Sequence, residues 1–149
     1  MKKGVFPGSF DPFTKGHTDI VKRSVVLFDE VVIGIGHNDQ KKRYFPIEET
    51  KEKIESVFAD EPKVKVAIYQ GLTAEFAKSV GARYLIRGLR NTTDFEYENS
   101  ICQANKYLWN ELETVFLITS PVYASISSSI IREIHRHGGD VSSLLPYRL

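Results

Sequence analysis

The sequence has little of what marks a secreted, membrane-bound or nucleic-acid-binding protein. Its 149 residues include one cysteine, Cys102, which excludes an internal disulfide framework and a cysteine-only metal cage. No apolar run is long enough to cross a bilayer, and an expected strand follows Met1 to Lys3 at once, where a signal peptide would have an apolar segment. The formal net charge is +1, so no overall positive field predicts nucleic-acid binding. We therefore expect a cytoplasmic protein with no membrane or nucleic-acid partner.

The bulk composition is that of a globular protein. Hydrophobic residues make up 42% of the chain and charged residues 26%. A chain of this length buries a core without disulfides or metals, and no repeat, linker or low-complexity tract divides it. We expect a single domain over residues 1–149.

Strand and helix patterns alternate along the chain. Continuous apolar runs such as 31–35 and 64–69 are typical of strands buried on both faces. The alternation predicts an α/β fold, a Rossmann-like, doubly wound, parallel five-stranded sheet with helices on both faces. The expected strands are 2–6, 31–35, 64–69, 84–87 and 114–119. The expected helices are 16–27, 46–58, a short one closed by Gly81, 92–109, and one that runs from the Ser127 group to Gly138-Gly139.

The stretch from Val5 to Ile20 combines a strand, a glycine-bearing loop and a helix start. Pro7-Gly8 is expected to end the first strand, and the helix begins near Gly16-His17. This arrangement aims backbone N–H groups and a helix N-terminus at an anion. Small residues at Gly8 and Ser9 would let a phosphate approach the backbone closely.

Ligands of parallel sheets bind outside the carboxyl ends of the strands. Several polar or charged residues occupy loops that each follow an expected strand, and the topology should bring them to one rim. These residues are Ser9, Lys41, Thr73, Arg87 and the serines 127–129.

Each of these positions also has a plain structural interpretation. A lone histidine such as His17 is usually a capping or core residue, and Lys41-Lys42-Arg43 reads equally as a solvated charge run. Arg87 and Arg90 could form surface ion pairs, and Thr73 and the serines could be helix caps. Lys42 and Arg43 are interpreted as surface residues or helpers that close over the site.

Three other features carry no predicted chemistry. Gly34-x-Gly36 is not a dinucleotide fingerprint, because Asp39 stands where the third glycine belongs. The histidines at 37, 135 and 137 show no metal-ligand spacing, so no protein metal site is expected. Cys102 lies within an expected helix and is interpreted as a packing residue.

The motifs together resemble a known family. Ser9-Phe10-Asp11-Pro12 followed by Thr14-Lys15-Gly16-His17 is similar to the (H/T)xGH signature of the nucleotidyltransferase superfamily, in the form found in bacterial phosphopantetheine adenylyltransferases. The similarity continues in order through Lys41-Lys42, residues 86–90, residues 94–98 and residues 126–129, and so covers nearly the whole chain.

The resemblance implies roles for individual residues. The catalytic residues would be His17, Lys41, Arg90 and Ser9. The residues binding ATP would be Ser9, Phe10, His17, Gly88, Leu89, Arg90, Glu98, Tyr123, Ala124, Ser125, Ile126, Ser127, Ser128 and Ser129. The acceptor, pantetheine 4'-phosphate, would be bound by Ser9, Lys41, Thr73 and Arg87.

The resemblance also implies a reaction. ATP and pantetheine 4'-phosphate would give dephospho-coenzyme A and pyrophosphate, the penultimate step of coenzyme A synthesis. Mg²⁺ would accompany ATP, and the family forms homohexamers, with the helix near residues 95–109 as a candidate interface. The acceptor phosphate is already an anion at neutral pH, so catalysis would consist of positioning and of stabilising charge on the α-phosphate.

Two alternatives remain at this point. A nicotinate mononucleotide adenylyltransferase usually has His where Thr14 stands and lacks the block from Arg87 to Glu98. A catalytically silent nucleotide-binding module is the other, and the presence of His17, Lys41 and both arginines argues against it. One departure from the family is that the chain stops at Leu149, where many members continue into a further helix.

Overall fold

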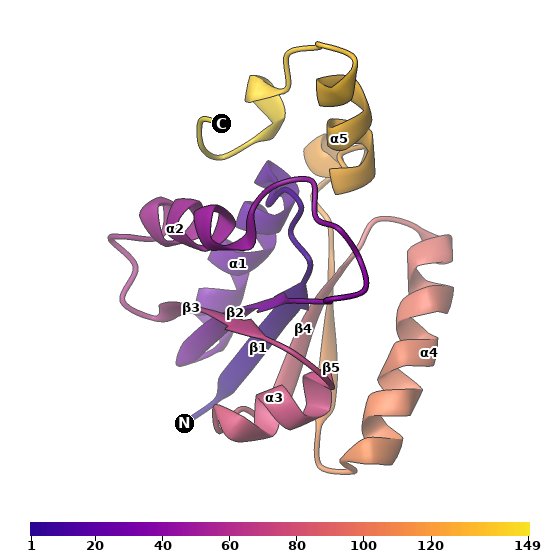
Figure 1. The fold of residues 1–149 in the computed structure, drawn as a ribbon. Helices are drawn as coiled ribbons and strands as arrows, with labels where there is room; N and C mark the ends of the chain where they lie inside the picture. The colour runs from indigo at the N-terminus through magenta and orange to yellow at the C-terminus, as the bar shows by residue number, and fades with distance from the viewer.

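The structure is a computed structural model that describes residues 1–149, and it contains one parallel five-stranded sheet. The strand order is β3-β2-β1-β4-β5, so the chain starts in the middle of the sheet and winds outward in both directions (Figure 1). This confirms the predicted fold class. The strands are β1 (Lys3–Gly8), β2 (Glu30–Gly36), β3 (Val64–Tyr69), β4 (Tyr84–Leu89) and β5 (Glu113–Ile118).

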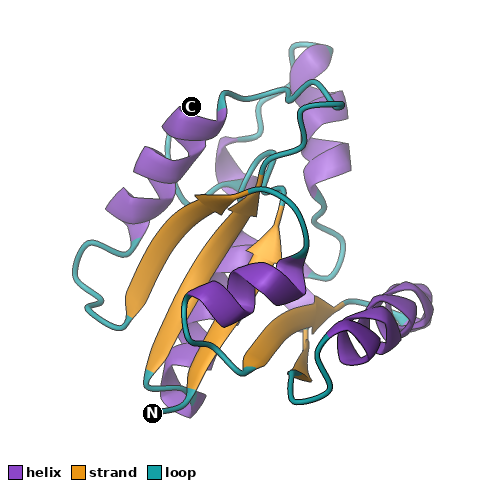
Figure 2. Ribbon diagram, turned by 60° about the horizontal axis from the view of Figure 1, so that its bottom comes forward, coloured by secondary structure: helices purple, strands orange, loops and turns teal.

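Helices cover both faces of the sheet (Figure 2). They are α1 (Lys15–Leu27), α2 (Ile47–Val57), α3 (Thr73–Ser79), α4 (Thr92–Leu108) and α5 (Ser128–Arg136), with short 3₁₀ turns at Pro121–Tyr123 and Ser142–Leu144. α1 and α2 pack on one face and α3 with the end of α4 on the other. α5 and the C-terminal segment lie beyond the carboxyl ends of the strands (Figure 1). No helix is both long and apolar enough to cross a membrane.

Successive side chains of the central strands point to opposite faces of the sheet and contribute to the core on both sides. Ile33 and Ile35 of β2 point into the layer below α1 and α2, while Val32 points into the layer below α3. All three side chains are buried, as the continuous apolar run predicts for a strand covered on both faces. The end of the sheet is therefore a rigid platform for the loops that leave it.

β1 continues through Pro7 and Gly8, so the prediction that these residues end the strand is wrong. The reason is that β1 pairs over different lengths with its two neighbouring strands. It pairs with β2 as far as Gly8, but with β4 only as far as Val5. Pro7 has no N–H to donate to a ladder. β1 and β4 consequently separate at their carboxyl ends, which is where loops of a doubly wound sheet form ligand sites.

The inner face of α4 differs from the predicted one. In the sequence, the spacing of Ile101, Ala104, Asn105 and Leu108 predicts that they share one face of this helix. Ala104 and Leu108 are exposed, however, while Glu98 and Asn105 are buried. A helix turns about 100° per residue, so the stripe toward the sheet consists of Glu98, Ile101, Cys102 and Asn105.

α5 belongs to a small satellite core of its own. Ile131 packs with Val141 and Leu145 from the C-terminal segment. The Tyr44 hydroxyl lies 2.6 Å from His135 Nδ1 and ties this unit to the loop after β2. Segments nearly a hundred residues apart thus close over the same end of the sheet.

A packing test follows from the close approach of α3 to β2. A Cβ at Gly34 would lie 2.7 Å from the Phe76 ring, which stacks on Tyr69 with centroids 4.3 Å apart. Gly34→Ala should therefore lower the free energy of unfolding by about 1–3 kcal/mol, because the Phe76 ring and the Tyr69 ring stacked on it would have to shift. Gly36→Ala is the matched control, since its Cβ meets nothing closer than 3.6 Å. Equal urea midpoints for the two variants would contradict this packing.

Candidate active site

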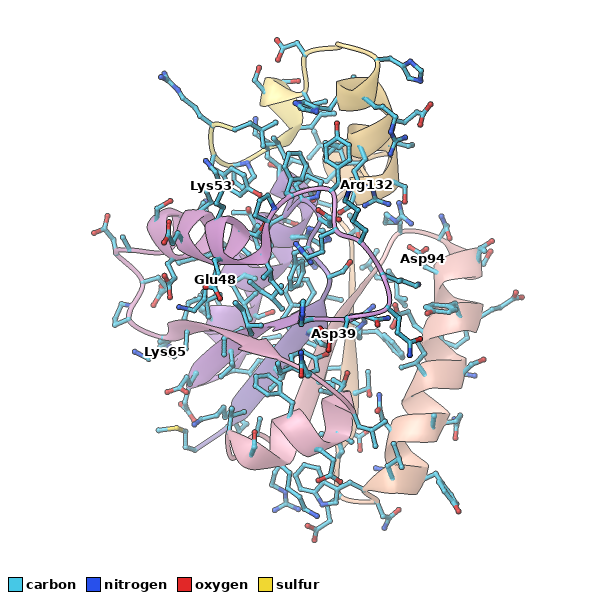
Figure 3. All side chains as sticks on the ribbon, viewed as in Figure 1. Asp39, Glu48, Lys53, Lys65, Asp94 and Arg132 are labelled. Carbon is cyan, nitrogen blue, oxygen red and sulfur yellow. The ribbon has the colours of Figure 1, made fainter.

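Two adjoining cavities open at the carboxyl end of the sheet, where β1 and β4 separate. The larger cavity, of about 660 Å³, extends from the loop after β2 down the inner face of α4. The smaller cavity, of about 470 Å³, lies between the start of α1, the end of β4 and the start of α5. Asp39, Asp94 and Arg132 come from three elements around this end of the sheet (Figure 3). Both cavities are lined by Pro7, Gly8, Ser9, Arg87 and Glu98.

The loop of residues 9–12 is held by its carbonyl groups. Arg43 donates to the first two carbonyls at 2.6 and 3.3 Å. Arg132 donates to the third at 2.6 Å, and the Ser128 hydroxyl donates to the fourth at 2.7 Å. With its oxygens turned toward these donors, the loop leaves the amides of residues 9 and 10 without a protein acceptor. Free amides beside a cavity are anion-binding groups.

Arg43 is not the surface residue that the charge run suggested. Its side chain is 13% exposed and lies 3.8 Å from the Asp11 carboxylate, which also accepts the backbone N–H groups of Tyr44 and Phe45 at 2.8 Å each. Burial lowers the pKa of Arg43, and the nearby Asp11 charge acts in the opposite direction. The run is thus divided: Arg43 is built into the loop, and Lys41 and Lys42 are exposed.

Phe10 adopts a strained backbone conformation with φ of +48°. A left-handed conformation is unusual for a bulky residue and costs on the order of 1–3 kcal/mol. Its buried ring compensates by packing against Phe6, Phe13 and the His17 imidazole, with centroids 5.0–5.2 Å apart. The aromatic cluster fixes the loop and the histidine with respect to each other.

His17 caps a helix and also lies at the wall of the smaller cavity. It is the third residue of α1 and forms a capping box with Thr14, whose hydroxyl accepts the His17 amide at 3.2 Å. In return, His17 Nδ1 accepts the Thr14 amide at 2.9 Å. Nδ1 is therefore unprotonated, and the neutral ring carries its proton on Nε2, at the wall of the smaller cavity. His17 is a helix cap that also offers a hydrogen-bond donor.

The environment keeps this imidazole neutral. Burial, with smaller contributions from the charges of Arg87 and Arg90, lowers the pKa of His17 to about 3. The ring is thus a neutral donor at physiological pH, and its protonation state does not change between about pH 5 and pH 9.

Arg87 connects three elements around the space between β1 and β4. Its guanidinium donates to the Pro7 carbonyl and forms two hydrogen bonds with Glu98, at 2.5 and 2.7 Å. Glu98 is 7% exposed, so this carboxylate is not the solvated side chain that a helix face normally carries. The pair forms the boundary between the two cavities.

Arg90 is held by the first turn of α4. It forms two hydrogen bonds with the Asp94 carboxylate, at 2.9 and 3.1 Å, and these hydrogen bonds lower the pKa of Asp94. Arg90 also reaches the Ile126 carbonyl at 3.5 Å. Its guanidinium thus faces the smaller cavity in a fixed orientation.

The start of α5 closes the smaller cavity. Ser127 is its N-cap and accepts the Ile130 amide at 3.2 Å, which confirms the predicted cap. Thr73, by contrast, does not cap α3: its hydroxyl lies 2.8 Å from that of Tyr69, on the wall of the larger cavity.

The structure brings most of the predicted site residues together. Those assigned to ATP that line the smaller cavity are Ser9, Phe10, His17, Gly88, Arg90, Glu98, Tyr123, Ile126, Ser127, Ser128 and Ser129. Those assigned to the acceptor that line the larger cavity are Ser9, Thr73 and Arg87. Four predicted residues line neither cavity: Leu89, which is buried, and Lys41, Ala124 and Ser125.

Sequence reasoning missed several residues of the two walls. Arg132 and Asp94 line the smaller cavity, and Asn105 and Cys102 line the larger one. Arg132 carried a usable signal, since it lies one helical turn after the serine run. Nothing in the sequence marks Asn105, because its position depends on how α4 rotates against the sheet.

Comparisons with known proteins agree with this geometry. The cytidylyltransferase-like family model matches residues 5–134, and the class defined by fold and site is that of the nucleotidyltransferases. A phosphopantetheine adenylyltransferase of Cytophaga hutchinsonii is 66% identical over 148 residues, covering 99% of both chains. One of Flavobacterium johnsoniae is 53% identical and covers 98% of this chain and 95% of its own. The chain therefore belongs to the phosphopantetheine adenylyltransferase family, as the sequence motifs indicated.

Solved structures support the fold. A bifunctional NMN adenylyltransferase/ADP ribose pyrophosphatase from Francisella tularensis superimposes with a TM-score of 0.76 at 17% identity. The match covers 98% of this chain and 45% of that larger protein. At this identity the likeness shows a shared fold.

The lowered pKa of His17 predicts a pH-dependent stability. In the unfolded chain the imidazole has a pKa near 6.5, so at lower pH the unfolded chain takes up a proton that the folded chain does not. The free energy of unfolding should fall as the pH decreases from about 7 toward 3, by about 2 kcal/mol between pH 8 and pH 5 from this residue.

His17→Gln isolates this contribution, because glutamine keeps a capping acceptor and does not titrate. Urea unfolding of both proteins at several pH values measures it. An unchanged pH dependence in the variant would show that His17 does not titrate in this way.

Proposed function

We propose that the protein transfers the adenylyl group of ATP to pantetheine 4'-phosphate, giving dephospho-coenzyme A and pyrophosphate. The observation that carries the proposal is the pair of cavities that meet at Ser9, Arg87 and Glu98. A two-substrate transfer requires two sites with one common boundary. The names of the related enzymes supply the substrate class.

In this mechanism the acceptor occupies the larger cavity, with its phosphate near Ser9 and Arg87. ATP occupies the smaller cavity, with its α-phosphate at the common boundary. A phosphate oxygen of the acceptor attacks the α-phosphorus, a new P–O bond forms, and the bond to pyrophosphate breaks. The nucleophile is already an anion, so the chain needs to provide position and charge stabilisation.

The charged and polar groups of the smaller cavity fit these tasks. His17 Nε2–H donates to the α-phosphate as negative charge develops there, and its low pKa keeps it a donor without a net charge. Arg90 and the start of α5 bind the departing phosphates, and the free amides of Ser9 and Phe10 bind the oxygens at the boundary.

Mg²⁺ enters this proposal with ATP. The two carboxylates lining the smaller cavity, Asp94 and Glu98, each pair with an arginine. No group of three His, Cys, Asp or Glu side chains in the chain is arranged to hold a metal ion. The ion would therefore take its ligands from phosphate oxygens and water, and when bound it would neutralise phosphate charge.

We also propose that the protein acts in the cytoplasm, where ATP is available, as a homohexamer. Large apolar side chains are exposed on α4 and on the outer strand β5, among them Tyr97, Tyr107, Leu108 and Ile118. Such a surface fits contact with another copy of the chain. The stoichiometry rests on the family resemblance alone.

A direct test incubates the protein with Mg²⁺-ATP and each of four candidate acceptors. Pantetheine 4'-phosphate should be converted to dephospho-coenzyme A, and unphosphorylated pantetheine should be a poor acceptor because nothing would engage Ser9 and Arg87. Nicotinamide and nicotinate mononucleotides should give no product. Mass spectrometry of the products decides, and EDTA should abolish turnover. Comparable use of both pantetheines would refute the assignment.

Loss of His17 should affect turnover more than ATP binding. An interaction made mainly in the transition state appears in kcat, and its removal typically costs about a hundred- to a thousandfold. His17→Gln should therefore fold, bind ATP within about tenfold of normal and turn over at least ~100 times more slowly. His17→Ala should in addition lose about 1 kcal/mol of stability, because half of the capping box is gone.

Calorimetry measures ATP binding in these variants and pyrophosphate release measures turnover. His137→Gln is the control, since the exposed His137 lines neither cavity. Turnover near normal in the His17→Gln variant would exclude the imidazole from the mechanism.

Lys41 gives a separate prediction about the loop after β2. It is exposed, but its neighbours Asn38, Asp39 and Gln40 line the larger cavity. If the loop closes over the acceptor phosphate, Lys41→Ala should raise the acceptor KM by about tenfold or more, the typical loss for a charge-assisted hydrogen bond. Lys42→Ala is the matched control and should have less effect. A larger defect in the control would reverse the two roles.

A further inference from the structure

Cys102 lines the larger cavity, whereas the sequence suggested a residue that only packs against its neighbours. It lies on the inner stripe of α4, half-buried, between Ile101 and Asn105, which line the same wall. It is the only cysteine in the chain. The larger cavity therefore contains one thiol, at a distance from the Ser9 and Arg87 end.

Asn105 shows that this inner wall is built to face a polar ligand. Its side chain is more than nine-tenths buried and lines the cavity, and its amide makes no hydrogen bond within the protein. Its amide atoms keep contact with the open cavity and are not buried without a partner, so the amide is free to bind a polar group there. Cys102 lies one helical turn from it, so a ligand that engages the amide passes the thiol.

The acceptor arm is longer than the distance from the phosphate end of the cavity to Cys102. At 1.5 Å per residue, Cys102 lies about 6 Å and Asn105 about 10 Å along the helix from Glu98, which marks the phosphate end of the cavity. The arm of pantetheine 4'-phosphate is about as long as an extended tetrapeptide, about 14 Å. It contains two amides and ends in a thiol. Anchored by its phosphate, an extended arm would carry its sulfur past Asn105, and a bent arm brings the sulfur alongside Cys102.

We propose that Cys102 is a thiol–disulfide exchange site for the oxidised form of the acceptor, an inference that rests on the proposed function. The Cys102 thiol loses its proton, and the thiolate attacks one sulfur of the disulfide of pantetheine 4'-phosphate. A new S–S bond joins Sγ to one arm, the old S–S bond breaks, and the other arm leaves as a thiolate that takes up the released proton. The disulfide is the only oxidant required.

This exchange has a functional consequence. The captured arm occupies the larger cavity and blocks the acceptor, and a reducing thiol restores the free enzyme. The enzyme would thus be inactivated when its own acceptor pool becomes oxidised, and reactivated when it is reduced.

The test uses the intact assembled enzyme and the disulfide of pantetheine 4'-phosphate, with 2-hydroxyethyl disulfide as a probe that has no phosphate or amides. Intact-protein mass spectrometry should show one added arm per chain, and peptide mapping should place it on Cys102. The reaction should be at least about tenfold faster with the first disulfide, because binding positions its sulfur. Reduced acceptor should slow the reaction, and dithiothreitol should remove the adduct and restore turnover.

Two variants sharpen the result. Cys102→Ser should form no adduct, and treatment should not lower whatever turnover the variant has. Asn105→Ala should retain the cysteine but react more slowly with the phosphorylated disulfide only. Equal rates with the two disulfides, or a rate unaffected by reduced acceptor, would show ordinary reactivity of an accessible thiol and overturn the proposal.

The readouts separate this inference from the proposed function. Adduct formation needs neither ATP nor catalysis. An untreated enzyme that makes dephospho-coenzyme A but forms no adduct refutes the role of Cys102 alone. Selective adduct formation by a protein without adenylyl transfer refutes the reaction, and leaves a thiol site that recognises the phosphorylated arm.

Discussion

The ion pair of Arg87 with Glu98 joins β4 to α4 across the space where β1 and β4 separate. The same guanidinium donates to the Pro7 carbonyl, so one side chain ties three elements together at the boundary of the two cavities. Glu98 is buried, and removal of its partner would leave an uncompensated charge inside the protein. The shape of both cavities therefore depends on this ion pair. Its hydrogen bonds are directional, and a hydrophobic contact in the same place would be less so.

The fold was predictable because its signals are local. Continuous apolar runs marked β2 and β3, and the serine run and Gly81 marked helix ends that the structure confirms. The alternation of strands and helices then determined that Ser9, Thr73 and Arg87 lie at one rim of the sheet, where they line the cavities. The error at Pro7 arose because a proline ends pairing with only one of two neighbours, and the sequence does not show which strands those are.

The rest of the site could not be read from the sequence, because it depends on contacts between distant segments. Arg43 looks like its neighbour Lys42, yet it is buried because the carbonyls of residues 9 and 10 happen to face it. Likewise, α4 has several apolar stripes, and only packing decides that Asn105 faces a cavity while Leu108 faces outward. Family resemblance gave the residues of the smaller cavity more completely than those of the larger one.

The hydrogen bonds that hold the loop of residues 9–12 have a consequence for the order of folding. Arg132 and Ser128 hold carbonyls that precede them by 121 and 116 residues. During synthesis the first strand and its loop emerge early, but these two side chains that orient the loop emerge more than a hundred residues later. Contacts of such long sequence separation form late, after loop closure. A ribosome-bound chain can therefore assemble much of the sheet while the loop of residues 9–12 is still without the contacts that orient it, and the walls of the smaller cavity are completed only with α5.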